Sequence, residues 1–140
     1  MKLMMFPLLL FVSQHASGLE LEVQQGVESV LLHCQVPVDV SKNSIAVWNR
    51  NEFTDPTVHM RLQSGDDLSQ QNSRYKHRTW MRSDALQTGD LSLTLRNPTV
   101  SDSGTYTCIA RSRGLDQSTI VIQLEVKGEW TEVRGQLQRS

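Results

Sequence analysis

Three segments of the chain alternate apolar and polar side chains with a period of two, which is the pattern of a β-strand with one buried face. The second segment ends at Asn97-Pro98, where proline removes a donor of the hydrogen-bond ladder, and the third ends at Gly128. The pattern predicts an all-β protein in which the three faces share one core. The apolar positions are Val30, Leu32, Cys34 and Val36 in the first segment, Leu91, Leu93 and Leu95 in the second, and Ile120, Ile122, Leu124 and Val126 in the third.

The region between the first two segments is expected to hold three more strands. Residues 45–50 form one of them, with Trp48 and Ala46 on its buried face. Residues 58–62 and 75–81 form the other two, on either side of a polar segment at 63–73. Because its ring is large, Trp48 is expected to anchor the core.

The stretch from Asp102 to Cys108 follows the spacing D-x-G-x-Y-x-C, which resembles one strand of immunoglobulin-type domains. The resemblance implies that Gly104 permits a tight turn and that the Tyr106 hydroxyl returns to the backbone as a tyrosine corner. It also implies an upstream cysteine and a buried tryptophan, which the chain supplies as Cys34 and Trp48. The expected fold is an immunoglobulin V-type antiparallel β-sandwich with Greek-key connections and one inter-sheet disulfide.

The N-terminus has the order of a secretory signal peptide: one positive charge at Lys2, an apolar run at 3–12, and small residues up to Gly18. An uncleaved membrane anchor is the alternative, but roughly ten apolar residues fall short of the about 20 that cross a bilayer. We expect cleavage after Gly18, a single domain at 19–127, and a polar, disordered C-terminal tail at 128–140.

Secretion exposes the only two cysteines, Cys34 and Cys108, to an oxidising compartment, so a disulfide between them is expected. They lie 74 positions apart, and a bridge that closes a loop of this length stabilises the fold by about 4 kcal/mol in the chain-entropy model. This separation fits a variable-type domain, which inserts extra strands, better than a constant-type one.

Charge and side-chain chemistry argue against several classes of function. With 14 basic and 15 acidic residues, the chain offers no electrostatic basis for binding nucleic acid. The histidines His33, His59 and His77 fall on three different predicted strands and form no ligand motif, so each is expected to be solvated. Asp66-Asp67 is interpreted as a solvated turn. We therefore expect no enzyme activity, and no catalytic, metal-binding or cofactor-binding residues.

A narrower resemblance lies in Val58-His59, Gly65-Asp66, Gln71-Asn72 and the run from Arg74 to Thr79. These segments are similar to butyrophilins, myelin oligodendrocyte glycoprotein and related T-cell co-regulatory ligands. The resemblance covers about Val23 to Lys127 and implies a structural ion pair between Arg78 and Asp102.

Members of this family usually continue into a second domain and a membrane span, and neither is expected here. The protein is therefore expected to be secreted or to lie on the external side of the plasma membrane. The chain also lacks the Phe-Gly-x-Gly bulge through which antigen-receptor variable domains pair, so pairing of that kind is not expected.

Alternation places one set of side chains on the outside of the sheet that carries Trp48 and Cys108. We expect its three aliphatic members to form an exposed apolar patch that marks protein contact. In the alternative interpretation, a covering loop or self-association hides these aliphatics. The end loops at 39–43 and 113–117 are short, charged and without aromatics, which makes them less suited to recognition. The outward set is Val47, Asn49, Thr107, Ile109, Arg111 and Val121.

The leading functional hypothesis follows from this face and from the family resemblance. It is a non-catalytic immune domain, butyrophilin-like, that binds a receptor on lymphocytes and regulates T-cell activation. The alternatives are a homophilic adhesion domain that pairs through the same face, and a secreted decoy form.

Overall fold

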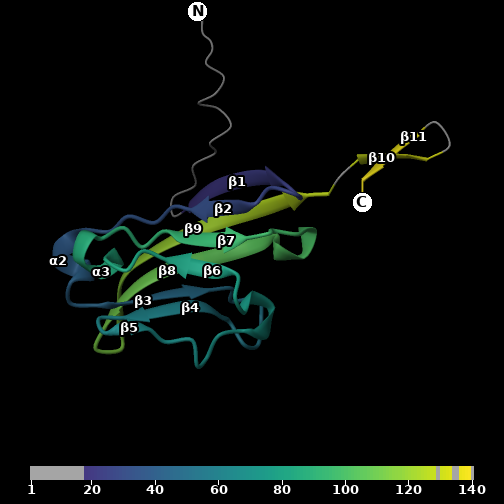
Figure 1. The fold of residues 1–140 in the computed structure, drawn as a ribbon. Helices are drawn as coiled ribbons and strands as arrows, with labels where there is room; N and C mark the ends of the chain where they lie inside the picture. Colours follow the sequence, from purple (N-terminus) through teal and green to yellow (C-terminus); the bar gives the residue numbers. More distant parts are fainter. Residues whose placement is uncertain (1–17, 129, 134–135, 140) are drawn as a thin grey trace, which may run out of the picture.

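Two β-sheets pack face to face in the computed structural model, which describes residues 18–128, 130–133 and 136–139 (Figure 1). The larger sheet has the order β1-β9-β8-β3-β4-β5 and the smaller one the order β2-β7-β6. The strands of the larger sheet are β1 (Gly18–Gln24), β9 (Leu115–Lys127), β8 (Gly104–Ser112), β3 (Ile45–Asn49), β4 (Thr57–Leu62) and β5 (Gly65–Asp66). Those of the smaller sheet are β2 (Ser29–Leu32), β7 (Leu93–Arg96) and β6 (Thr79–Met81).

Short helices lie outside the sheets. Helices α2 (Val38–Ser41) and α3 (Ala85–Thr88) lie side by side at one end of the sandwich (Figure 1). Single 3-10 turns occupy Ser73–Tyr75 and Val100–Asp102. Within the described residues no helix has the length and apolar character needed to cross a membrane.

The core lies between the sheets and is lined by the three alternating segments. Their inward side chains are buried, except that Ile120 is half-buried at the edge. Trp48 is fully buried, and its indole Nε1 donates to the Leu91 carbonyl at 2.8 Å, so the polar atom of the ring is satisfied. The disulfide Cys34–Cys108 joins the two sheets beside it, with a Cα–Cα distance of 6.5 Å. The expected fold class is confirmed.

Two strands are shorter than their patterns predict. The expected strand at 75–81 begins only at Thr79, because a 3-10 turn ends at Tyr75 and His77 adopts a left-handed backbone with φ of 64°. Regular pairing of β2 ends at Leu32, because the Cys34 N–H donates to the Ser92 hydroxyl at 3.1 Å instead of to a carbonyl. The strands expected at 45–50 and 58–62 are confirmed as β3 and β4.

The first and last strands differ from what the sequence predicts. The sandwich is not antiparallel throughout, because β1 pairs in parallel with β9, from Gly18 opposite Val121 to Gln24 opposite Lys127. Past Gly128 the chain forms the antiparallel pair β10 (Trp130–Val133) and β11 (Gln136–Arg139), where a disordered tail was expected. The expected signal peptide falls almost wholly outside the described residues, so cleavage after Gly18 stays a prediction.

Candidate functional site

The outer face of the larger sheet consists of rows of residues that the strand register places side by side. The first row crosses the sheet from Met60 through Val47 and Ile109 to Thr119. The neighbouring rows are Asn49, Thr107 and Val121 on one side, and Ile45, Arg111 and Asp116 on the other. None of the six predicted face residues belongs to the core cluster, so the outward direction assigned from alternation is correct.

Exposure on this face is lower than expected at three positions. Val47 is only 2% exposed, Ile109 5% and Thr107 8%. The prediction that Val47, Ile109 and Val121 form an open apolar patch is therefore wrong for Val47 and Ile109, while Val121 is half-exposed. The reason lies in the register: Val47 has Met60 and Ile109 as direct cross-strand neighbours, which cover it from both sides. The surface that the face offers a partner therefore comes from half-exposed residues, namely Ile45, Asn49, Met60, Leu62, Arg111 and Val121.

Arg111 was expected as a lone charge at the rim, and the structure gives it a partner. Its Nε lies 2.7 Å from the Asp116 carboxylate on β9. A register shift between Ala110 and Arg111 brings the two residues opposite each other, which alternation alone does not predict. Because both side chains are partly exposed, the pair adds little to stability, and a partner can compete for either charge.

Asn49 carries a polar atom that the fold leaves unsatisfied. Its Oδ1 is buried and has no hydrogen-bond partner among the described residues. A buried acceptor without a donor costs about 1–3 kcal/mol. The cost falls on a residue of the outer face, in the same row as Thr107 and Val121.

One edge of this sheet is held by a buried histidine that was expected to be solvated. His59 is 1% exposed because it lies opposite Trp48 and thus faces the inside of the sandwich. Its Nδ1 lies 2.8 Å from the Thr79 hydroxyl, and its Nε2 lies 3.0 Å from Asp66 Oδ1. Arg61 Nη1 donates to the same oxygen at 2.8 Å.

Asp66 is exposed, as expected, but it lies in β5 and its carboxylate is bound by both His59 and Arg61. Burial raises the pKa of its carboxyl, but the hydrogen bonds and charges of His59 and Arg61 outweigh burial and leave the pKa below its ordinary value. The carboxylate joins β5 to β4, while His59 joins β4 to Thr79 of β6. This edge of the larger sheet is thus fixed by charge as well as by backbone pairing.

The loop end of the sandwich is hollowed between α2 and the β8–β9 turn. An open hollow of about 500 Å³ lies there, and the Leu115 side chain beside it is 67% exposed. Residues 39–43, expected as a loop, lie largely in α2. The hollow adjoins the row of Ile45 and Arg111, so it extends the candidate face at one end. Its lining is Asp39, Val40, Asn43, Ser44, Ser112, Arg113, Leu115 and Gln117.

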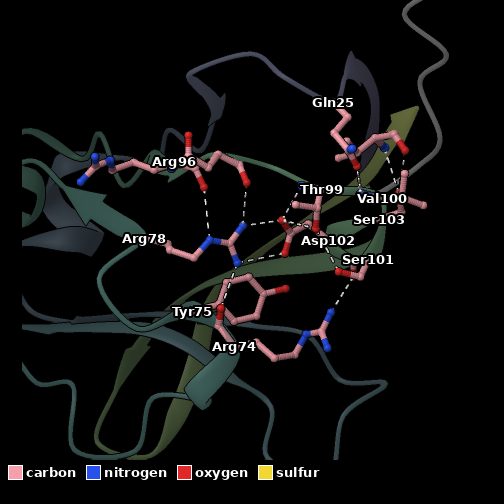
Figure 2. Close-up of polar contacts among 12 residues, drawn as sticks. Gln25, Arg74, Tyr75, Arg78, Arg96, Thr99, Val100, Ser101, Asp102 and Ser103 are labelled. Atoms are coloured by element: carbon pink, nitrogen blue, oxygen red, sulfur yellow. Dashed lines mark hydrogen bonds and ion pairs between the residues drawn. The ribbon is translucent and has the colours of Figure 1, made fainter. Parts of the chain in front are cut away.

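The opposite end is closed by the corner that the D-x-G-x-Y-x-C motif indicates, and Figure 2 shows its polar contacts. Arg78 binds Asp102 with both terminal nitrogens, at 2.5 and 3.3 Å, and the Asp102 side chain is 1% exposed. Thr99 N–H adds a donor to the same carboxylate at 2.9 Å. The Tyr106 hydroxyl donates to the Asp102 carbonyl at 2.5 Å, and burial raises the pKa of this phenol. These groups are satisfied by one another and leave nothing for a ligand.

Sequence reasoning missed the most connected residue of this corner, Arg50. It is 4% exposed, donates to the Tyr75 hydroxyl at 2.9 Å and to the Ser103 carbonyl at 2.7 Å, and lies over the Phe53 ring. A Cβ on Gly104 would collide with the Arg50 guanidinium and with the Glu52 carboxylate. The glycine is therefore required by a close approach as well as by its φ of 156°, and not by a tight turn alone.

Nothing in this geometry indicates catalysis. Among the residues that the structure describes, no three His, Cys, Asp or Glu side chains gather in a way that could hold a metal ion. The buried polar groups His59, Arg50 and Asp102 are bound to other side chains or to the backbone. The outer face and the hollow can offer contact area and the partly exposed Arg111–Asp116 ion pair, which suits protein recognition.

Comparison with known proteins agrees with this interpretation. The family model for the immunoglobulin V-set domain matches residues 17–127. Mouse (Mus musculus) V-set domain containing T-cell activation inhibitor 1 is 35% identical over 61% of this chain, and mouse butyrophilin-like protein 2 is 31% identical over 71%. The chain spans only 30% and 22% of the lengths of these two relatives.

A similar fold occurs in a solved structure. The crystal structure of ICOS in complex with ICOS-L and an anti ICOS-L VNAR domain contains a chain that matches with a TM-score of 0.71. The match covers 84% of this chain and 58% of the other, at 21% identity. At that identity the likeness shows the fold alone.

Proposed function

The chain belongs to the immunoglobulin V-set family, and from this premise we propose that it is a non-catalytic recognition domain that binds a receptor on lymphocytes and regulates T-cell activation. The contact surface is the outer face of the larger sheet, extended by the hollow at its loop end. Ile45, Met60 and Val121 provide half-exposed apolar area, and Arg111 and Asn49 provide polar specificity.

The observation that carries this proposal is the combination of apolar and polar side chains on one face. The half-exposed Asn49 and Arg111 lie on either side of a row of aliphatics that the core does not use. Surfaces with an apolar centre and a polar rim are typical of protein interfaces. The relatives supply the immune setting, since one of them is named for inhibition of T-cell activation.

The test is to stain resting and activated lymphocytes with a multimer of residues 19–127. Two variants probe the face at positions that are half-exposed and therefore tolerate a charge, Val121→Glu and Arg111→Glu. The matched control is Trp80→Glu, which replaces a 56% exposed apolar side chain by the same charge on the smaller sheet. We expect the face variants to lose staining at least tenfold, because a charge at an apolar contact or a reversed charge at a rim pair opposes binding.

The control separates loss of the contact from loss of the fold. Staining that persists in both face variants would show that the receptor binds elsewhere. Staining that is lost equally in Trp80→Glu would point to the smaller sheet. The proposal also fails if the multimer of the unmodified domain stains no lymphocyte population.

A further inference from the structure

The smaller sheet has an open edge at β2. Its only neighbour in the described sheets is β7, with Val30 opposite Leu95 and Leu31 opposite Thr94. Hydrogen bonds to the β7 side use even-numbered positions of this segment, since Glu28 accepts from Asn97 at 2.8 Å and Cys34 accepts from Leu91 at 2.8 Å. In an antiparallel ladder the N–H and C=O of the residues between them point the other way.

The outward positions are Ser29, Leu31 and His33, and all three side chains are exposed. Among the described residues, none forms a backbone hydrogen bond with their N–H or C=O groups. The edge therefore offers donors and acceptors at three alternate residues in a row. Such an edge is a template for another strand unless charge, proline or a bulge protects it.

Charge protects the other edges of the two sheets but not this one. Strand β1 carries Glu20 and Glu22, and β5 is two residues long and ends in Asp66. Strand β6 is three residues long and lies between Arg78 and Arg82. Pairing any of these edges with its own copy would bring like charges together. The exposed side chains of β2 carry no charge at neutral pH, and the strand contains neither proline nor bulge.

We propose that a second copy of this chain pairs along β2, antiparallel and about a two-fold axis at Leu31. In that register Leu31 lies opposite Leu31 of the other copy, and Ser29 lies opposite His33. Each outward N–H meets an outward C=O, because an antiparallel pair of identical strands is self-complementary about such an axis. The Leu31 side chains, 42% exposed in one copy, cover each other, and the imidazole and hydroxyl form a polar pair.

The paired copies form one continuous sheet from the two smaller sheets. The larger sheet of each copy lies in the other layer of the sandwich, so both recognition faces stay free. The inference goes beyond the proposed function, because it concerns a different sheet and does not depend on any receptor. One short strand buries little area, so the dimer is expected to be weak and to depend on concentration.

The test measures self-association of residues 19–140 by sedimentation velocity over a range of concentrations. We expect a monomer–dimer equilibrium in the micromolar to millimolar range. Leu31→Lys is expected to weaken it at least about tenfold, because two like charges then face each other at the axis. Trp80→Lys is the matched control, since it replaces another exposed apolar residue of the same sheet away from the edge and should not change the equilibrium.

A charge-swap experiment tests the register itself. Leu31→Lys and Leu31→Glu are each expected to be monomeric alone and to form a mixed dimer when combined, since position 31 faces position 31. Far-UV circular dichroism of each variant should match that of the unmodified chain, as the side chain is exposed. A monomer at all concentrations, equal loss in Trp80→Lys, or no mixed dimer would overturn the proposal.

Discussion

Single residues in this domain show why the direction of a side chain on a sheet is easier to predict than its exposed fraction. Alternation along a strand fixes which face a side chain points to, and it placed Val47, Thr107 and Ile109 outward correctly. Exposure depends on the neighbours across the sheet, which come from distant parts of the chain. Buried polar residues are harder still, since Arg50 and His59 are satisfied by partners up to 53 positions away.

Asn49 allows a test that separates stability from function. Replacing it by leucine, which is similar in size, removes the unpaired buried Oδ1, and we expect the free energy of unfolding to rise by about 1 kcal/mol. The same change should reduce lymphocyte staining, because it removes a half-exposed polar group from the proposed contact face. Urea denaturation and multimer staining measure the two effects. A less stable Asn49→Leu domain would mean that the fold itself satisfies the amide.

Gly104 allows a test of the buried corner. In Gly104→Ala the new Cβ collides with the Arg50 guanidinium and the Glu52 carboxylate, at a φ of 156° that L-residues rarely adopt. We expect the free energy of unfolding to fall by about 2–4 kcal/mol. Gly114→Ala is the control, because its φ of 78° is also positive but the space around it is open. Equal losses in both variants would show that backbone strain alone explains the effect.

Whole strands could be predicted where apolar and polar residues alternate over several consecutive positions. The three alternating segments follow from period-two alternation. The strands at 45–50 and 58–62 were expected from Trp48 and from the resemblance to variable-type domains, and the shortened β6 was not expected. There His77 takes a left-handed conformation and the Asn72 side chain accepts from the Arg74 N–H, which starts a 3-10 turn in place of a strand. The parallel pairing of β1 with β9 is a long-range contact that no local pattern encodes.

The stability of the edge strand β5 and its neighbour β4 should depend on pH through Asp66. Its pKa is lower in the folded protein than its ordinary value of 3.8, so the unfolded chain binds a proton first as pH falls. The stability that the carboxylate contributes is therefore complete above about pH 4 to 5 and is lost as pH drops through the folded pKa. Asp66→Asn should destabilise the domain near pH 7, and the difference from the unmodified domain should shrink toward pH 2 to 3. Thermal unfolding across this range measures it, and a constant difference would contradict the role of the charge.

At the scale of the molecule, the cysteine spacing, the buried tryptophan and the corner motif were enough to predict the sandwich. They act together, because the Cys34–Cys108 bridge and the buried Trp48 connect the two sheets across the core. The proposed pairing edge at β2 was harder to predict from the sequence. It is open because no other strand of the described sheets pairs with that side of β2. An absent neighbour leaves no signal in the sequence of the strand itself.

The two proposed surfaces together predict how valency controls binding. If β2 pairs two copies and leaves both faces free, the unmodified chain engages cells through two sites, which raises apparent affinity by 10²–10⁴ where both engage. At concentrations near or above the dimer's dissociation constant, Leu31→Lys should therefore stain activated lymphocytes more weakly than the unmodified chain when neither is multimerised. When both are fused to the same dimerising partner, staining should be equal, because the receptor face is unchanged. Flow cytometry over a concentration series measures both comparisons. If Leu31→Lys stays weak in the fused form, the β2 edge belongs to the receptor contact itself, and the separation of the two surfaces is wrong.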